Sequence, residues 1–161
     1  MNIPKIGEFY HFWDSGKSSP GRHYICKVEN IITPEEAKNI IVTVPEWNFD
    51  TKSEELIDKP LFDHWVSRKT DHYWLYADTT DFFVEASCPH YDDNNLWFVR
   101  TKTYNNGWFS LDIQSWWQGG RLDIDGSIYD YNVKNYKECF NCTDEEALEL
   151  YPLATEENWK K

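Results

Sequence analysis

Two of the four cysteines, Cys139 and Cys142, have the spacing of half a structural zinc site or of a redox pair. A closed zinc site needs four ligands, and no second pair has that spacing, so Cys88 and His90 would have to be recruited across the fold. The redox alternative requires a helix N-terminus, and Cys142 does precede a helix-capping pattern. We favour two incidental thiols at the start of a helix, and we predict no bound metal and no cofactor.

Asp123, Asp125 and Gly126 look like the opening of a calcium-binding loop. The third acidic ligand before the glycine and the closing glutamate are both missing, so the pattern fails as a calcium site. An Asp-Gly turn between two strands explains the same residues better. We therefore predict a hairpin turn at this point of the chain.

The five histidines are scattered along the chain beside aromatic residues, so packing against rings is their expected role. A barrel could unite His11, His23 and Asp112 in a buried cluster, but the sequence does not derive one. The motifs of nucleotide binding and acyl transfer, such as Gly-x-Gly-x-x-Gly and Gly-x-Ser-x-Gly, are missing. Because the spacing of paired catalytic carboxylates is set in three dimensions, a hydrolase built on carboxylates and His stays open as an alternative.

The stretch between Asn94 and Ile124 is the most aromatic part of a chain with nine Trp, ten Tyr and nine Phe residues. Strand alternation sends Trp108 away from the apolar residues that follow it, and adjacent extended residues such as Trp116 and Trp117 cannot both enter one core. Trp and Arg in a polar rim are typical of an interface hot spot or of a sugar-stacking platform. In the alternative, the rings belong to a second small core covered by residues 46–69. The candidate binding residues are Trp108, Asp112, Trp116, Trp117, Arg121 and Asp123.

These residues must be positioned by strands, which the pattern indicates along most of the chain. Asn106-Gly107 is the strongest local signal, because a tight type I′ turn needs positive φ at both central residues. It predicts a hairpin that joins residues 96–102 to residues 108–113. The other strands expected from alternation or from β-branched and aromatic content are residues 6–13, 22–32, 40–44, 73–76, 81–88 and 121–124.

Helix signals are few. Thr33 and Thr143 each begin a capping-box pattern, and Pro34 follows the first of them at the position that favours helix entry. A weak pattern between residues 46 and 69 indicates a helical turn at residues 53–57 and a second at residues 61–68. The expected helices are residues 34–39, 54–58 and 143–150, with residues 46–69 as an irregular or helical excursion, residues 155–161 as a loose tail and residues 129–137 unassigned.

The chain of 161 residues has no repeat, low-complexity linker or composition break, so we expect a single globular domain over residues 1–161. Its aromatic composition favours half-buried strands over helices. We predict a β-rich α+β fold: a single bent antiparallel sheet or a small, partly open barrel, with a few short helices.

The formal net charge is −12, with 28 acidic against 16 basic residues. Such a protein repels phosphate backbones and anionic lipid head groups, so we expect no nucleic acid and no membrane as partners. The chain begins without the apolar core of a signal peptide, and no apolar run approaches membrane-spanning length. We therefore expect a cytoplasmic protein with reduced cysteines.

We expect from these patterns a small acidic intracellular binding protein and not an enzyme. It would dock a macromolecular partner, such as a basic protein, through the aromatic patch, as a neutralising or adaptor protein does. A carbohydrate or small-ligand binding module is the alternative of a different class, and the carboxylate and His hydrolase is the third. Neither the partner nor the oligomeric state follows from the sequence.

Overall fold

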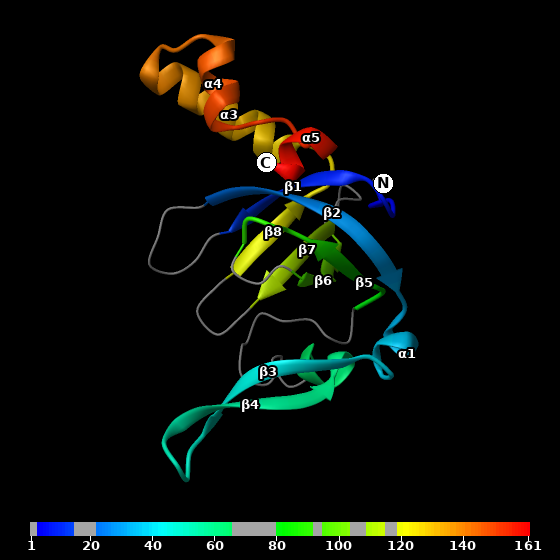
Figure 1. Ribbon diagram of the computed structural model, residues 1–161. Helices are drawn as coiled ribbons and strands as arrows, with labels where there is room; N and C mark the ends of the chain where they lie inside the picture. The colour runs from blue at the N-terminus through cyan, green and yellow to red at the C-terminus, as the bar shows by residue number, and fades with distance from the viewer. Residues whose placement is uncertain (1–2, 15–21, 66–79, 92–94, 104–108, 115–118) are drawn as a thin grey trace.

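The computed structural model describes residues 3–14, 22–65, 80–91, 95–103, 109–114 and 119–161. Six antiparallel strands in this part of the chain close into a barrel in the order β1-β2-β5-β6-β7-β8 (Figure 1). Their bounds are β1 Phe9–Asp14, β2 Arg22–Ile32, β5 Phe83–Ser87, β6 Asn95–Thr103, β7 Phe109–Gln114 and β8 Gly119–Asp123. The β-rich antiparallel character predicted from the composition is confirmed.

The barrel closes where β8 returns to β1. Paired residues join these two strands from His11 opposite Asp123 to Asp14 opposite Gly120. A glycine is needed at this seam, because a Cβ at position 120 would collide with the ring of Phe12. The sequence left open a bent sheet or a partly open barrel, and the pairing of β1 with β8 makes the barrel closed.

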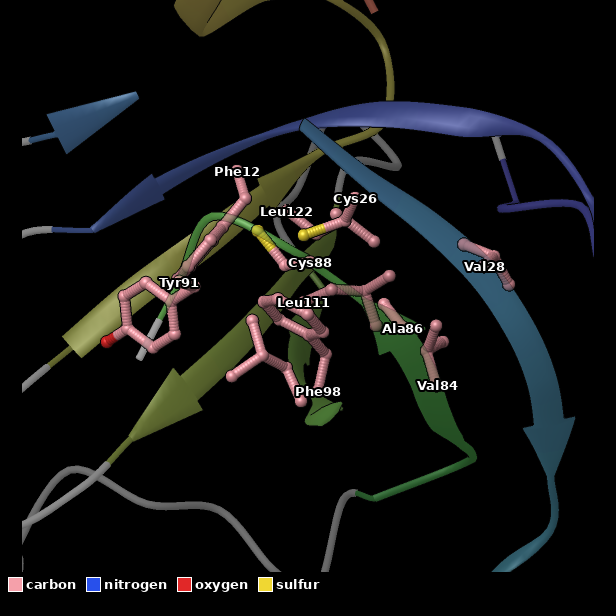
Figure 2. Close-up of a cluster of buried hydrophobic side chains, with 11 residues drawn as sticks. Phe12, Cys26, Val28, Val84, Ala86, Cys88, Tyr91, Phe98, Leu111 and Leu122 are labelled. Carbon is pink, nitrogen blue, oxygen red and sulfur yellow. The ribbon is translucent and has the colours of Figure 1, made fainter. Parts of the chain in front are cut away.

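Side chains from all six barrel strands fill the interior (Figure 2). On β1, Phe12 points inward and is fully buried, while its neighbours His11 and Trp13 lie on the outer side. The interior cluster consists of Phe12, Cys26, Val28, Val84, Ala86, Cys88, Tyr91, Leu96, Phe98, Leu111 and Leu122.

A second core lies outside the barrel, beside a two-stranded hairpin. The hairpin consists of β3 (Ile41–Asn48) and β4 (Ser53–Pro60), and residues 61–65 continue the chain as a helix. Val99 of β6 enters this core because Phe98 points into the barrel and alternate side chains face opposite ways. Its buried members are Ile32, Ala37, Leu61, Trp65, Phe83 and Val99. A second core that uses residues from the 46–69 segment is thus present.

The helical turn expected at residues 54–58 is wrong, because these residues belong to β4. They include helix-favouring Glu54, Glu55 and Leu56, yet β4 pairs with β3 along its whole length. Tertiary pairing therefore overrides local helix propensity here. The excursion at residues 46–69 accordingly contains a regular strand as well as the helical residues 61–65.

The two capping boxes are confirmed. The Thr33 side chain caps α1 (Pro34–Ala37), and the Thr143 side chain caps α4 (Asp144–Leu150). The tail that we expected to be loose forms α5 (Glu156–Lys160). Its Trp159 ring docks on the barrel, where Nε1 donates a hydrogen bond of 3.0 Å to the Ser87 carbonyl oxygen.

The hairpin turn expected at Asp125-Gly126 is wrong, because these residues lead from β8 into α3 (Ser127–Phe140). Gly126 is the N-cap of α3 with φ of 76°, a left-handed conformation that glycine adopts without strain. The Asp125 carboxylate accepts a hydrogen bond of 3.1 Å from the Ser127 backbone N–H. Most of α3 coincides with the stretch that the sequence left unassigned.

The pairing of β6 with β7 confirms the expected partner strands of the aromatic hairpin. The turn at Asn106-Gly107 and the strand at residues 73–76 lie outside the described residues. Figure 1 shows α5 beside the barrel, α3 and α4 packed together and projecting away from the same side, and the β3–β4 hairpin on the opposite side. None of the helices in the described ranges is both long and apolar enough to span a membrane.

Candidate functional site

Half of the candidate binding residues belong to β7 and β8. Asp112 and Arg121 stand opposite each other in these strands, with 3.4 Å between the Arg121 Nε and Asp112 Oδ1 atoms. The Arg121 side chain remains 46% exposed, so this ion pair lies at the surface. The three tryptophans of the same prediction, Trp108, Trp116 and Trp117, lie outside the described residues.

Asp123, the remaining candidate, is 4% exposed and holds the start of α3. Its carboxylate accepts hydrogen bonds from the backbone N–H groups of Tyr129, at 2.9 Å, and of Ile128, at 3.4 Å. Burial raises the pKa of Asp123 above its ordinary value, while these two donors act in the opposite direction. The structure therefore gives Asp123 a capping role and separates it from the exposed Asp112–Arg121 pair.

Two histidines meet on the outer wall of the barrel. His11 Nδ1 lies 2.6 Å from His23 Nε2, so one ring donates a hydrogen bond to the other. The sequence named these two residues together with Asp112, but the carboxylate opposite His11 in the barrel is that of Asp123. Asp112 instead faces Arg121, because β8 lies between β7 and β1.

Aromatic rings from the C-terminal segment cover the histidine pair. Tyr129 stacks on His11 with 3.9 Å between ring centroids, and Tyr151 lies 5.9 Å from His23. The Tyr129 hydroxyl also donates a hydrogen bond of 2.7 Å to the Tyr151 carbonyl oxygen. Trp13 completes the cover at 4.8 Å from His23. His11 is consequently 7% exposed, and this cluster packs the helical segment against the barrel.

The environment of the pair keeps both rings neutral. Burial, together with the smaller effect of the neighbouring His23 ring, lowers the pKa of His11 to about 3. Burial also lowers the pKa of His23 to about 4. A general base works best with a pKa near the operating pH and within reach of its substrate. The pair meets neither condition in this structure, so its geometry favours a packing role.

An exposed apolar surface lies on the outer face of the β3–β4 hairpin. Strand pairing places Ile41, Pro45 and Trp47 on one face, with Leu56 directly opposite Pro45. The exposed fractions are 61% for Ile41, 54% for Trp47, 74% for Leu56 and, in the connecting turn, 83% for Phe49. We call Ile41, Pro45, Trp47, Phe49 and Leu56 the hairpin patch.

The other face of the hairpin is turned toward the protein. Val42 packs against the second core, and Val44 is buried. The hairpin is therefore anchored through one face, and the hairpin patch is not required for that anchoring. Single exposed apolar side chains are ordinary, whereas a contiguous exposed apolar patch often marks a contact surface.

Carboxylates lie on both faces of the hairpin: Glu54 stands opposite Trp47 on the face of the hairpin patch, whereas Glu46 and Glu55 pair on the other face. The acidic residues between positions 46 and 58 are Glu46, Asp50, Glu54, Glu55 and Asp58, and all are exposed. Lys59 forms an ion pair with Glu46, and Lys52 lies in the turn with φ of 53°. A hollow of about 330 Å³ at the tip is lined by Trp47 and Phe49 together with acidic side chains. The surface thus combines rings with negative charge.

Sequence reasoning missed the hairpin patch because residues 46–69 have the weakest pattern in the chain. A usable signal does exist between Ile41 and Trp47, where Val42 and Val44 alternate with Thr43 and Pro45. Extending that strand beyond Pro45 would have placed Trp47 on the outer face. Pro45 looked like a strand end, although proline is tolerated in a strand that lies at an edge.

Of the cysteines at positions 139 and 142, only Cys142 sits at a helix start as expected, directly before the N-cap Thr143 of α4. Cys139 lies in the last turn of α3, and Cys142 lies between α3 and the N-cap of α4. Within the described ranges, no three His, Cys, Asp or Glu residues come together as a group that could hold a metal ion.

Comparison with known proteins found no matching family model, no matching curated protein and no matching solved structure.

Proposed function

We propose that this protein is a non-catalytic binding protein that docks a basic protein partner through the hairpin patch. The observation that carries the proposal is the exposed apolar face of β3–β4, with Trp47 and Phe49 more than half exposed in a rim of carboxylates. Aromatic anchors inside a polar rim are the usual composition of binding hot spots.

The apolar part of the surface supports affinity. Burying a side chain such as Phe49 or Leu56 in a partner stabilises a complex by about 1.5–3 kcal/mol per residue. In the free protein this gain is unrealised, because these side chains are 83% and 74% exposed. The hairpin reaches its place through its inner face, so the patch is available without unfolding.

The charge supports the choice of partner. The whole chain carries −12, and the acidic residues on the hairpin outnumber Lys52 and Lys59. Complementary charge accelerates association and disfavours acidic competitors. A partner segment that mixes Lys or Arg with apolar residues would satisfy both the rings and the carboxylates. Both a neutralising protein and an adaptor protein fit this proposal.

The aromatic patch expected around Trp108, Trp116, Trp117 and Arg121 stays a second proposed contact surface. The exposed Asp112–Arg121 pair supports a polar rim at that end of the barrel. The hydrolase alternative is less favoured, because the His11–His23 pair is covered by Tyr129.

Selection of random peptides on the immobilised protein tests the proposal. We expect the enriched peptides to combine Lys or Arg with apolar residues and to bind more weakly as salt rises. The double variant Trp47→Ala/Phe49→Ala should weaken binding at least about 30-fold, as expected for loss of hot-spot rings worth about 2 kcal/mol. Its free energy of unfolding should change by less than about 0.5 kcal/mol.

Phe140→Ala is the matched control, because Phe140 is 68% exposed on α3, away from the hairpin. It should leave peptide binding unchanged. Enriched peptides that bind the double variant as tightly as the original protein would refute the hairpin patch. If Trp108→Ala abolished their binding instead, the contact surface would be the aromatic patch around Trp108, Trp116, Trp117 and Arg121. Peptides without basic residues would refute the charge argument.

A further inference from the structure

The two fully buried cysteines face each other inside the barrel. Cys26 belongs to β2, and Cys88 directly follows β5. The β2–β5 register pairs Lys27 with Ser87, so one further step places Cys26 opposite Cys88. Figure 2 shows the two sulfur atoms near one another in the interior cluster, where the two thiols interact. No motif in the sequence joins these residues, which lie far apart along the chain.

We propose that Cys26 and Cys88 form a reversible disulfide when the protein meets a hydroperoxide, and that they are an oxidation site of this fold. The proposal is independent of the hairpin patch. Its first support is geometric: directly opposed residues in antiparallel strands have Cα atoms about 4.5–5.5 Å apart, within the roughly 4.4–6.8 Å that disulfides span. The spacing expected at this register is therefore compatible with a disulfide.

The surroundings of the sulfur atoms favour a division of roles. The Cys88 sulfur interacts with the Cys26 thiol and with the backbone N–H groups of His90 and Tyr91; the Tyr91 N–H also donates a hydrogen bond of 3.1 Å to the Cys88 carbonyl oxygen. These donors lower the pKa of Cys88, with the Cys26 thiol as the largest cause, although burial acts against them. Burial raises the pKa of Cys26 well above its ordinary value, and Cys88 adds to this effect. The backbone N–H groups near the Cys88 sulfur favour Cys88 as the nucleophile, with Cys26 as the thiol that resolves the intermediate.

The chemistry balances with one molecule of hydrogen peroxide. The Cys88 thiolate attacks one peroxide oxygen, the O–O bond breaks, and the released hydroxide takes a proton to become water. The product is a sulfenic acid on Cys88. The Cys26 sulfur then attacks the Cys88 sulfur, the S–O bond breaks, and a second water leaves with the thiol proton. Both sulfur atoms are oxidised and the peroxide is reduced to two waters.

Because both cysteines are buried, the oxidant must be small enough to reach the barrel interior. Both cysteines are 0% exposed in the interior cluster, which also contains Tyr91 in edge contact with Phe12 and Tyr24. A water-sized peroxide can enter during local opening, whereas a bulky disulfide reagent needs a larger opening. The bond would close a loop of roughly 60 residues that includes the β3–β4 hairpin, so it would restrict the unfolded chain.

The test uses the full chain carrying Cys139→Ser and Cys142→Ser, which removes the two cysteines that are not buried. The folded protein is treated with hydrogen peroxide and digested without reductant, and its peptides are analysed by mass spectrometry. We expect one cross-linked peptide pair joining Cys26 to Cys88, with loss of two hydrogen atoms and full reversal by dithiothreitol. The melting temperature of the oxidised protein should rise by several degrees, because the loop is closed in the unfolded state.

Cys26→Ser separates the two steps, because its hydroxyl can still donate a hydrogen bond to the Cys88 sulfur but cannot form a disulfide. In this variant Cys88 should stop at the sulfenic acid and react with dimedone, while Cys88→Ala should leave Cys26 as a thiol. If either variant does not fold, cross-link mapping in the starting chain still decides the outcome. Unmodified Cys26 and Cys88 after peroxide treatment would overturn the proposal. So would sulfinic acid on Cys88 beside an intact Cys26 thiol.

Discussion

Two faces outside the barrel carry aromatic side chains. One face is covered by a later segment of the chain, and the other is exposed. On the wall formed by β1 and β2, Trp13 and the His11–His23 pair are covered by Tyr129 and Tyr151. On the outer face of β3–β4, the hairpin patch remains open. Both faces are products of strand alternation, which sends every second side chain away from the nearest core.

The two faces differ in whether a later segment of the chain folds back over them. After β8, Asp123 holds the start of α3 and directs the C-terminal segment back over β1. Across the described residues, β3 and β4 pair with each other alone, so the outer face of their hairpin has no layer above it. Whether an outward-facing ring is buried or exposed therefore depends on whether another segment of the chain covers it. Its own strand does not decide this.

Removing the cover should have the largest effect. We expect Tyr129→Ala to lower the free energy of unfolding by about 3–5 kcal/mol, because a buried ring is lost from its stack on His11. Leu56→Ala in the hairpin patch should change it by less than about 0.5 kcal/mol. Urea unfolding of both variants measures the contrast.

A conservative variant of Tyr129 tests whether its ring or its hydroxyl group provides most of this stabilisation. Tyr129→Phe keeps the ring and removes the hydrogen bond to the Tyr151 carbonyl, so it should cost only about 1 kcal/mol. Equal losses in Tyr129→Ala and Leu56→Ala would show that the two faces do not differ as described.

Acidification should weaken the covered face next. The pKa values of His11 and His23 are lowered in the folded protein to about 3 and about 4, below the ordinary 6.5. The unfolded chain therefore binds protons first as the pH falls, so the stabilisation is complete above pH 6.5 and is lost below it. Between pH 7 and pH 5 the loss should be about 2–4 kcal/mol. Asp123 has a raised pKa, so the folded protein binds its proton before the unfolded chain does, and its contribution has the opposite sign.

Urea unfolding at the two pH values measures this slope. His23→Gln should reduce the slope by about half, since one of two titrating rings is removed. His90→Gln is the control, because His90 is exposed, and it should preserve the slope. A slope that survives unchanged in His23→Gln would separate the acid sensitivity from the histidine pair.

The smallest expected effect concerns the far end of the covering segment. Trp159→Phe removes the hydrogen bond to the Ser87 carbonyl but keeps a ring near Phe9, whose centroid lies 5.5 Å from that of Trp159. The free energy of unfolding should fall by about 0.5–1.5 kcal/mol. Lys160→Ala, at an exposed neighbour, should have no measurable effect. Equal stability of the two variants would mean that α5 does not contribute to the cover.

Local signals in the sequence predicted the elements that depend on near neighbours. The capping boxes at Thr33 and Thr143 predicted α1 and α4, because a capping box involves residues only three positions apart. The alternation of apolar and polar side chains, together with aromatic and β-branched content, predicted β1, β2, β6 and β7. The antiparallel, ring-rich fold class followed from these strands.

Contacts between distant residues were harder to predict. The residues of β4 have the local pattern of a helical turn, because nothing in Glu54, Glu55 and Leu56 themselves indicates that they pair with β3. The Asp-Gly sequence was taken for a hairpin turn, since its role depends on Asp123 holding the start of α3. The place of the hairpin patch was missed for the same reason.

Residue types and their local spacing settled that this protein would be an acidic, ring-rich β fold with helices at the two capping boxes. Tertiary structure alone decided that β8 meets β1, that His11 meets His23, that Cys26 faces Cys88 and that Trp47 is left uncovered. Each of these outcomes depends on strand register between segments far apart in the chain. Register is fixed by the packing of whole faces, because a shift of one residue turns every side chain of a strand to the opposite side.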